Sequence, residues 1–193
     1  MFKKVFLYIF ILFTSISCKK IIDTTASFGK DEVKVEDFLT IKVNEEYSLG
    51  TPDYMKEMKT LHDEASFEYA NIYKETYAIV IDESKQEFVD TFKELDIYND
   101  EMSVLENYSD YQIKSLIESI ENATHKNIEI NIKNISSKHY ELHGKIDGLN
   151  IGYLIGFIEG NEKMFMIMTW TLDSRFNKYE NTFKMIQKSF KFI

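Results

Sequence analysis

The chain has 193 residues, of which 44% are apolar and 15% aromatic, and it contains one Cys, one Pro and seven Gly. This apolar and aromatic content excludes a disordered chain, and a single cysteine excludes a disulfide scaffold. The 32 Asp and Glu residues against 23 Lys and Arg give a net charge of −9, and Arg175 is the only arginine. Nucleic acid is therefore excluded as a partner, because phosphates are held by clustered Lys and Arg side chains.

The N-terminal segment has the layout of a secretory signal peptide. Lys3 and Lys4 precede an apolar run over residues 5–13, and small and polar residues follow over 14–17. A membrane-spanning helix needs roughly 20 consecutive apolar residues, so this run is too short to cross a bilayer. We therefore predict that residues 1–17 direct export and are removed from the mature protein.

The only cysteine, Cys18, stands directly after this segment. The preceding residues Ser15, Ile16 and Ser17 resemble a bacterial lipobox, with Ser15 in place of the leucine usual at its first position. The resemblance implies that the Cys18 thiol receives a diacylglyceryl group before cleavage, and a triacylated cysteine carries the more than one acyl chain that stable attachment needs. The alternative is a buried structural cysteine, which the polar residues on both sides of Cys18 disfavour. We predict a lipoprotein attached through Cys18 to a membrane of a bacterial cell envelope, on its periplasmic face or at the cell surface.

Residues 18–37 are polar and charged, with Ile21 and Ile22 as the only apolar pair. A segment of this composition buries too little apolar surface to order itself. We interpret it as a flexible tether. It leads to a single globular domain over 38–193, which we expect to be monomeric.

The domain begins with strand-like alternation. Leu39, Ile41 and Val43 alternate with polar residues, which predicts a strand over 38–51 with a break at 44–46. The three apolar residues Met55, Met58 and Leu61 recur at helical spacing, which predicts a short helix or helical turn over 53–61.

A β-hairpin and two helices are expected next. Alternating aromatic and aliphatic residues over 66–72 and 76–82 flank a short polar stretch, which is typical of paired strands. Two sequence patterns then match the capping box that opens a helix. They are Ser84 with Glu87, and Ser103 with Glu106.

Period-two alternation returns in four further segments, which predicts an antiparallel meander. These segments are 128–132, 140–146, 149–158 and 164–172. Between the last three, Asp147 with Gly148 and Gly160 with Asn161 favour two-residue turns with positive φ. The chain closes with five apolar residues spaced three and four apart, which predicts a helix packed on the sheet through one stripe. The stripe consists of Phe176, Tyr179, Phe183, Ile186 and Phe190.

The predicted order of elements is strands, two helices, four strands and a final helix. This order lacks the strand–helix alternation of parallel folds. We therefore expect an α+β fold in which one antiparallel β-sheet carries helices packed on its faces.

Three segments carry a resemblance to a known family. They are Phe-Leu-Thr-Ile-Lys-Val-Asn-Glu-Glu-Tyr-Ser-Leu over 38–49, the hairpin over 65–82, and 179–192 with its ending Ile-Gln-Lys-Ser-Phe-Lys-Phe. They are similar to the PsbP-like and DcrB-like family of small exported or lumenal domains. The resemblance covers about residues 38–193. It implies an α/β/α sandwich used as a binding or assembly module, and it carries over no site residue.

The search for catalytic and metal-binding motifs is negative. No Gly-rich phosphate loop and no Gly-x-Ser-x-Gly motif occurs in the sequence. On the predicted strand His139 and His143 share a face but lie about 13 Å apart, too far for one metal ion. We therefore predict no catalytic residue, no cofactor and no metal.

Two further groups of residues allow a functional interpretation. The adjacent acidic pairs are expected to serve solvation and helix capping rather than acid–base catalysis or calcium binding, because they lack the spacing of a calcium loop. They are Asp63 with Glu64, Asp82 with Glu83, and Asp100 with Glu101. Four tyrosines fall outside the apolar stripes and could form an exposed aromatic patch, although simple packing is favoured. They are Tyr98, Tyr108, Tyr111 and Tyr153.

Two functions from different classes remain. The favoured one is a lipid-anchored, non-enzymatic envelope module that binds a protein or a small ligand. The alternative is an envelope hydrolase with a carboxylate or histidine site, which is disfavoured because no nucleophile and base occur in a recognisable arrangement.

Overall fold

The structure is a computed structural model that describes residues 30, 31 and 33–193. The predicted signal peptide over 1–17, the lipidation candidate Cys18 and most of the predicted tether lie outside these residues. Among the residues that are described, no helix is long and apolar enough to span a bilayer.

Ten strands and three α-helices form within the described part of the chain. The strands are β1 (Phe38–Val43), β2 (Tyr47–Pro52), β3 (Lys56–Glu57), β4 (Ala65–Asn71), β5 (Thr76–Ser84), β6 (Glu121–Ile128), β7 (Ser137–Ile146), β8 (Leu149–Glu159), β9 (Lys163–Leu172) and β10 (Lys191–Phe192). The helices are α1 (Lys85–Glu94), α2 (Val104–Ser119) and α3 (Asp173–Lys188), and a 3-10 helix, Val35–Asp37, precedes β1.

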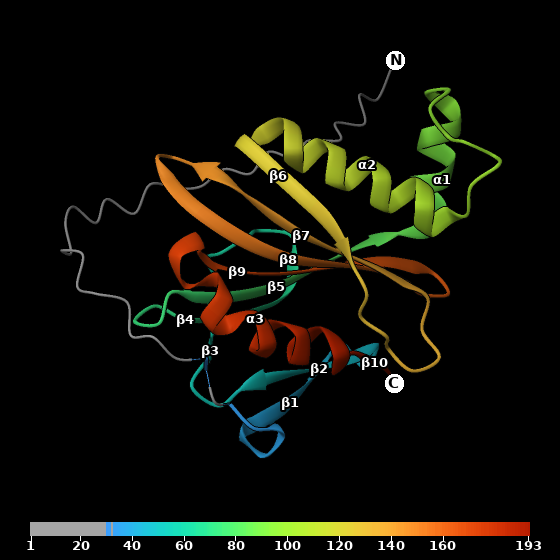
Figure 1. Ribbon diagram of the computed structural model, residues 1–193. Helices are drawn as coiled ribbons and strands as arrows, with labels where there is room; N and C mark the ends of the chain where they lie inside the picture. Colours follow the sequence, from blue (N-terminus) through green and yellow to red (C-terminus); the bar gives the residue numbers. More distant parts are fainter. Residues whose placement is uncertain (1–29, 32) are drawn as a thin grey trace.

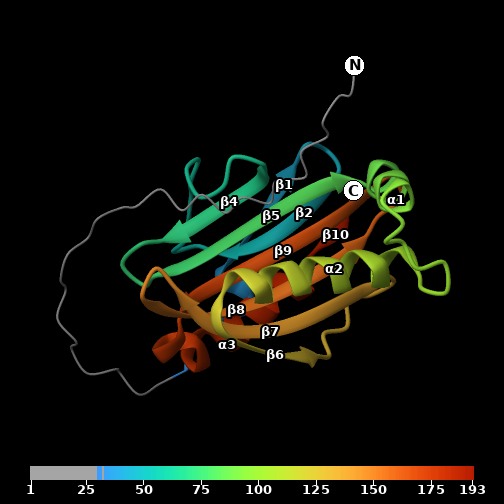
Figure 2. The same ribbon diagram turned by 90° about the horizontal axis from the view of Figure 1, so that it is seen from above.

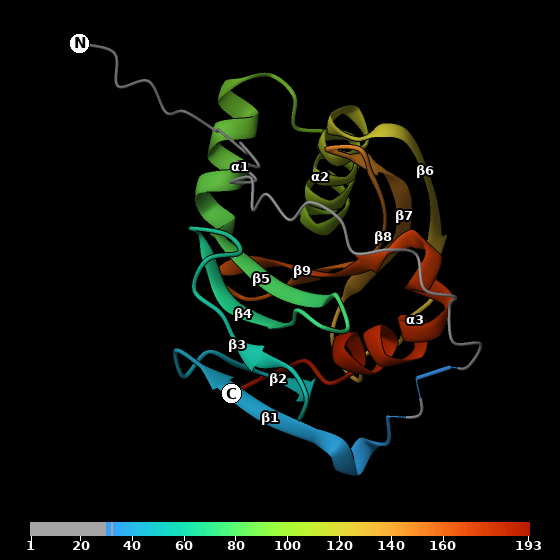
Figure 3. The ribbon, with the colours of Figure 1, turned by 90° about the vertical axis from the view of Figure 1, so that its left-hand side faces the viewer.

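The strands form two antiparallel sheets. The larger has the order β3-β4-β5-β9-β8-β7-β6, and the smaller has the order β1-β2-β10. Helices α1 and α2 cover one face of the larger sheet, whereas α3 and the smaller sheet lie on the other (Figures 1 and 3). Seen from above, α2 lies across β7 and β8, and α1 stands at the end of β5 (Figure 2). The predicted α+β fold with helices on both faces of an antiparallel sheet is confirmed.

Each face of the larger sheet has its own hydrophobic core. On β9, Met164, Met166 and Met168 pack in the core under α1 and α2, which we call the α1–α2 core. Phe165 and Ile167 point the opposite way into the core shared with α3 and the smaller sheet, which we call the α3 core. Because successive side chains of a strand face opposite sides, a strand buried on both faces is apolar almost throughout.

The predicted closing helix is confirmed as α3. All five residues of its apolar stripe are buried in the α3 core, including Phe190, which follows the end of the helix. The capping box at Ser103 and Glu106 is complete in α2. At α1, Ser84 accepts a hydrogen bond from the backbone N–H of Glu87, so this cap also forms.

The tight turns differ from one another. Asp147 and Gly148 both have positive φ, 49° and 84°, as predicted for the β7–β8 turn. Gly160 and Asn161 do not, and the β8–β9 turn closes instead through a bond from the Gly160 N–H to the Lys163 carbonyl, at 2.9 Å between N and O.

The helix predicted over 53–61 is wrong. Lys56 and Glu57 form β3 and pair with Ala70 and Tyr69 of β4, so the segment extends the larger sheet. Met55 is buried in the α3 core, which explains its apolar character without a helix. Tertiary pairing has overridden a weak local pattern, as is usual for segments this short.

The strand predicted over 128–132 is also misplaced. The strand is β6, which ends at Ile128, and Ile130 and Ile132 lie in an irregular segment buried in the α3 core. Their alternation therefore reflects burial rather than strand pairing. The residues of β6 itself are mostly exposed, so an apolar alternation is missing there.

The structure contains two sheets, whereas a single sheet was predicted. Strand β2 pairs with β1 and with β10 at the end of the chain, so these three strands separate from the larger sheet. Pairing between Tyr47 and Phe192 joins residues at opposite ends of the domain, which local patterns cannot reveal.

Candidate functional site

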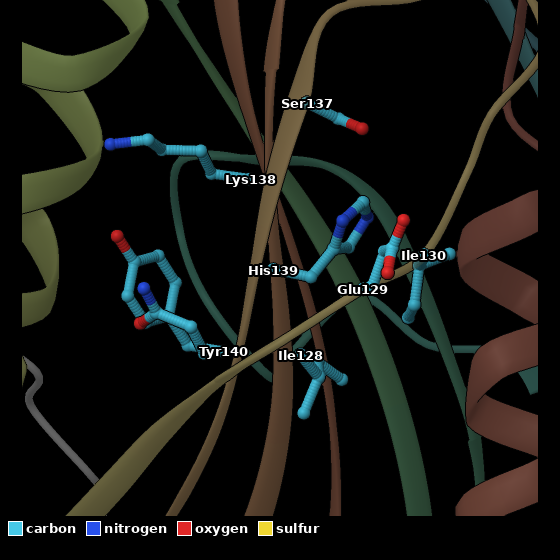
Figure 4. A pocket seen from close by; sticks show the side chains of 8 residues that line it. Ile128, Glu129, Ile130, Ser137, Lys138, His139 and Tyr140 are labelled. Atoms are coloured by element: carbon cyan, nitrogen blue, oxygen red, sulfur yellow. The ribbon is translucent and has the colours of Figure 1, made fainter.

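A pocket of about 360 Å³ lies where β6 separates from β7 (Figure 4). Its lining consists of Asn127, Ile128, Glu129, Ile130, Ser137, Lys138, His139 and Tyr140. The pairing of the two strands ends at Ile128 and His139, whereas β7 stays paired to β8 as far as Ser137. Burial of Ile130 in the α3 core draws the chain away from the sheet edge, which leaves the pocket between the diverging strands.

Side chains on β7 line the pocket from two sides. Lys138 and Tyr140 point toward α2, and His139 points the other way (Figure 4). The Lys138 Nζ lies 3.6 Å from the Asp110 carboxylate and 3.9 Å from the Glu106 carboxylate, and the Tyr140 hydroxyl donates to Asp110. The positive charge of Lys138 is therefore compensated within the protein.

The pocket lining contains a buried histidine, His139, which is 4% exposed. Burial disfavours the charged imidazolium and lowers the pKa of His139 to about 4. The ring is therefore neutral at physiological pH, and it offers one donor and one acceptor nitrogen.

His139 packs beside Gly156 of β8 and Gln187 of α3. The Gln187 amide N–H₂ donates to the carbonyls of Leu154 and Ile167, at 3.2 Å each, which fixes the orientation of the amide. A Cβ added to Gly156 would lie 2.2 Å from the Gln187 Oε1 and 3.0 Å from the His139 Nε2, so only glycine fits at this position.

These last two atoms, His139 Nε2 and Gln187 Oε1, are buried without a hydrogen-bond partner among the described residues. Buried polar atoms are nearly always paired, because an unpaired one costs roughly 1 to 3 kcal/mol. A buried, neutral and unsatisfied histidine next to an open pocket is the feature of this fold that best suits recognition of a polar group.

His143 is in a different position, although it shares a face of β7 with His139, as predicted. Its Nδ1 lies 2.5 Å from an Asp173 carboxylate oxygen and its Nε2 lies 3.0 Å from Glu141, which also binds Lys126 at 2.7 Å. Both ring nitrogens are therefore occupied. Within the described residues, no group of three or more His, Cys, Asp or Glu side chains is arranged to hold a metal ion.

The side chains of the acidic pair Asp82 and Glu83 lie on opposite faces of β5. Asp82 binds the Lys163 ammonium at 2.8 Å on one face of β5. On the other face, one Glu83 oxygen accepts hydrogen bonds from Tyr108 at 2.9 Å and from Gln112 at 3.1 Å, and burial raises the pKa of Glu83. The two carboxylates therefore cannot act as an acid–base couple. Asp63, Glu64, Asp100 and Glu101 are exposed.

The four tyrosines considered for an exposed patch are packed instead. Tyr108 and Tyr153 are buried in the α1–α2 core, and Tyr98 and Tyr111 are half-buried against it. Three of the rings contact other aromatic side chains, as Tyr108 does with Phe88 and Phe157, and the Lys93 ammonium lies over the ring of Tyr98. Simple packing, the favoured interpretation, is confirmed.

The sequence interpretation missed Gln187 and the role of Gly156. Gln187 stands four residues after Phe183 and so lies on the same stripe of α3. A glutamine on an otherwise apolar stripe was the available signal for a buried polar contact. The need for Gly156 depends on the approach of α3 to β8, which no sequence pattern shows.

No protein-family model and no curated protein matches this chain. Several solved structures match it. LpqN of Mycobacterium tuberculosis, described as involved in cell envelope biogenesis, is 8% identical over 76% of this chain and 82% of its own, with a TM-score of 0.51. The cyanobacterial PsbP protein CyanoP of Synechocystis is 10% identical over 84% of this chain and 96% of its own, with a TM-score of 0.47. PA94 of Pseudomonas aeruginosa, a protein of unknown function, is 13% identical over 79% and 94%, also with a TM-score of 0.47.

At these identities a likeness to a solved structure speaks for fold and not for function. The chain shares the general α+β fold of LpqN.

Proposed function

We propose that this protein is an exported bacterial lipoprotein whose domain acts as a non-enzymatic binding or assembly module of the cell envelope. The signal-peptide layout and the position of Cys18 support export and lipid attachment. The description of LpqN as an envelope-biogenesis protein is in keeping with this proposal. We also propose membership in the PsbP-like and DcrB-like family.

The binding site we propose is the β6–β7 pocket, and the observation that carries it is His139. Its ring is buried and neutral, its Nε2 lacks a hydrogen-bond partner among the described residues, and it lines the pocket. The charge of Lys138 is already compensated by Asp110 and Glu106. An uncharged polar group, on a partner protein or a small molecule, therefore suits this pocket best.

A hydrolase has less support. Among the groups that could act as acid or base, His143 holds two carboxylates through its ring nitrogens. Glu83 accepts two hydrogen bonds beneath α2. His143 would have to give up one of its carboxylates before taking a proton from a substrate, and one of the two Glu83 oxygens is already engaged.

Replacement of Cys18 by alanine tests the lipid anchor. Cys18→Ala should abolish incorporation of labelled fatty acid and leave an uncleaved or soluble protein, because the thiol is the attachment point. The measurement is labelling of the expressed protein in a bacterial host. A wild-type protein that incorporates no labelled fatty acid would show that the lipoprotein proposal is wrong.

Filling the pocket tests the binding site. Ser137 is half-buried in the pocket lining, whereas the adjacent Ser136 is exposed and outside it. A fractionated bacterial envelope extract should raise the melting temperature of the wild type and of Ser136→Trp, but not that of Ser137→Trp, because a ligand stabilises only a protein that binds it. Equal stabilisation of both variants would place the binding site elsewhere.

A further inference from the structure

Two exposed apolar side chains project from the turn between β4 and β5. Tyr73 is 89% exposed and Ile72 is 59% exposed, and we call this pair the apolar tip. The turn is well held, because the Asn71 side-chain oxygen accepts hydrogen bonds from the backbone N–H groups of Tyr73 and Lys74, at 3.1 and 2.9 Å. The Asn71 amide in turn donates to the carbonyl of Tyr54 at 2.8 Å. The tip is thus presented to solvent by a fixed backbone.

The N-terminal end of the domain is fixed beside this tip. The Asp31 carboxylate accepts hydrogen bonds from the Tyr54 hydroxyl at 2.8 Å and from the Thr182 hydroxyl at 3.0 Å. Lys74, the neighbour of Tyr73, reaches the same carboxylate at 3.5 Å and lies over the Tyr54 ring. The chain that leads back to Cys18 therefore leaves the domain next to the tip.

The distance to the lipid is short. Asp31 lies thirteen positions after Cys18 in the sequence, which is a span of at most about 45 Å when fully extended. A bilayer that holds the acyl chains of Cys18 is thus within reach of the end of the domain that carries the tip.

Charges around the tip are paired, so the acidic net charge of the protein is not concentrated there. Lys74 is paired with Asp31, and Arg175 lies 3.0 Å from the Glu75 carboxylate. Arg175 also donates to the Lys74 carbonyl at 3.2 Å, which ties the turn to α3. Tyrosine favours the interface between water and lipid, where its ring is buried and its hydroxyl stays hydrated.

We propose that the apolar tip contacts the surface of the bilayer to which Cys18 is attached, an inference that rests on the lipid anchoring proposed above. An acyl anchor and a second, weaker contact together fix the orientation of a domain on a membrane.

This orientation turns the pocket away from the membrane. Tyr77, next to the tip, is paired with Trp170 at one end of the larger sheet. The pocket residue Ser137 is paired with Ile158 near the other end, where Ile158 faces Phe165 of β9. The pocket therefore lies at the opposite end of the strands, where a partner in the surrounding compartment can reach it.

The test compares two positions on the full protein in lipid vesicles. With Cys18 acylated, Tyr73→Cys provides a single free thiol for an environment-sensitive fluorophore. The matched control is Ile97→Cys, at an exposed apolar residue whose N–H bonds the Phe92 carbonyl of α1. Helix α1 begins at Lys85, where β5 ends on the side of the sheet opposite the tip. In phosphatidylcholine vesicles that contain a nitroxide-labelled lipid, we expect at least twofold stronger quenching and a blue-shifted emission at position 73 relative to position 97.

Equal quenching at positions 73 and 97, in protein that has incorporated labelled fatty acid, would overturn the tip contact and leave the lipid anchor intact. Absence of fatty-acid incorporation would overturn both proposals. Both positions are exposed, so neither substitution should change the melting temperature, and this is measured alongside.

Discussion

Phe183→Ala is expected to lower the free energy of unfolding by about 3 to 5 kcal/mol, because it removes a fully buried ring and leaves a cavity. Phe183 lies on the stripe of α3 that covers the larger sheet, and its ring packs within the α3 core near those of Phe176 and Tyr179. Domains have only about 5 to 15 kcal/mol of stability in total. The loss should be evident in a denaturant titration as a large decrease in the midpoint.

The control for this experiment lies on the same helix. Lys188 is exposed in the last turn of α3, and Lys188→Ala should change the unfolding free energy by no more than about 0.5 kcal/mol. If the two variants unfolded at the same denaturant concentration, α3 would not be packed on the sheet through this stripe, and the sandwich arrangement would have to be abandoned.

Acidification is expected to destabilise the domain through His139, by about 3 kcal/mol between pH 6.5 and pH 4. The pKa of this histidine falls from 6.5 to about 4 on folding, because burial disfavours the charged ring. Above pH 6.5 the ring is neutral in both states. Below that pH the unfolded chain takes up a proton that the folded protein does not bind until about pH 4, so stability is lost as the pH falls through this window.

A pair of variants isolates this contribution from that of the carboxylates. His139→Gln removes the titrating ring, so the loss of stability between pH 6.5 and pH 4 should be smaller by about 3 kcal/mol than in the wild type. His125→Gln replaces an exposed histidine of β6 and should keep the wild-type dependence. The measurement is the unfolding free energy at a series of pH values. Identical pH profiles for wild type and His139→Gln would mean that His139 is not buried in its neutral form.

The sequence by itself determined the elements whose local signals are strong. The helical repeat of apolar residues is enough to predict the stripe of α3. A hydroxyl three residues before a glutamate is enough to predict the helix caps at Ser84 and Ser103. The Asp147–Gly148 turn is predicted by residues that tolerate positive φ. Each is set by a few adjacent residues. The order of these elements was enough to predict an α+β fold with helices on an antiparallel sheet.

Tertiary structure decided the features that depend on distant residues. Pairing of Lys56 and Glu57 with β4 replaced a predicted helix by a strand, and pairing of β2 with β10 divided one predicted sheet into two. The candidate site depends on the same kind of contact, because His139 of β7, Gly156 of β8 and Gln187 of α3 come together only in the folded chain. Burial is a property of the packed chain, so local sequence patterns can place His139 on a strand but cannot set its pKa or its partners.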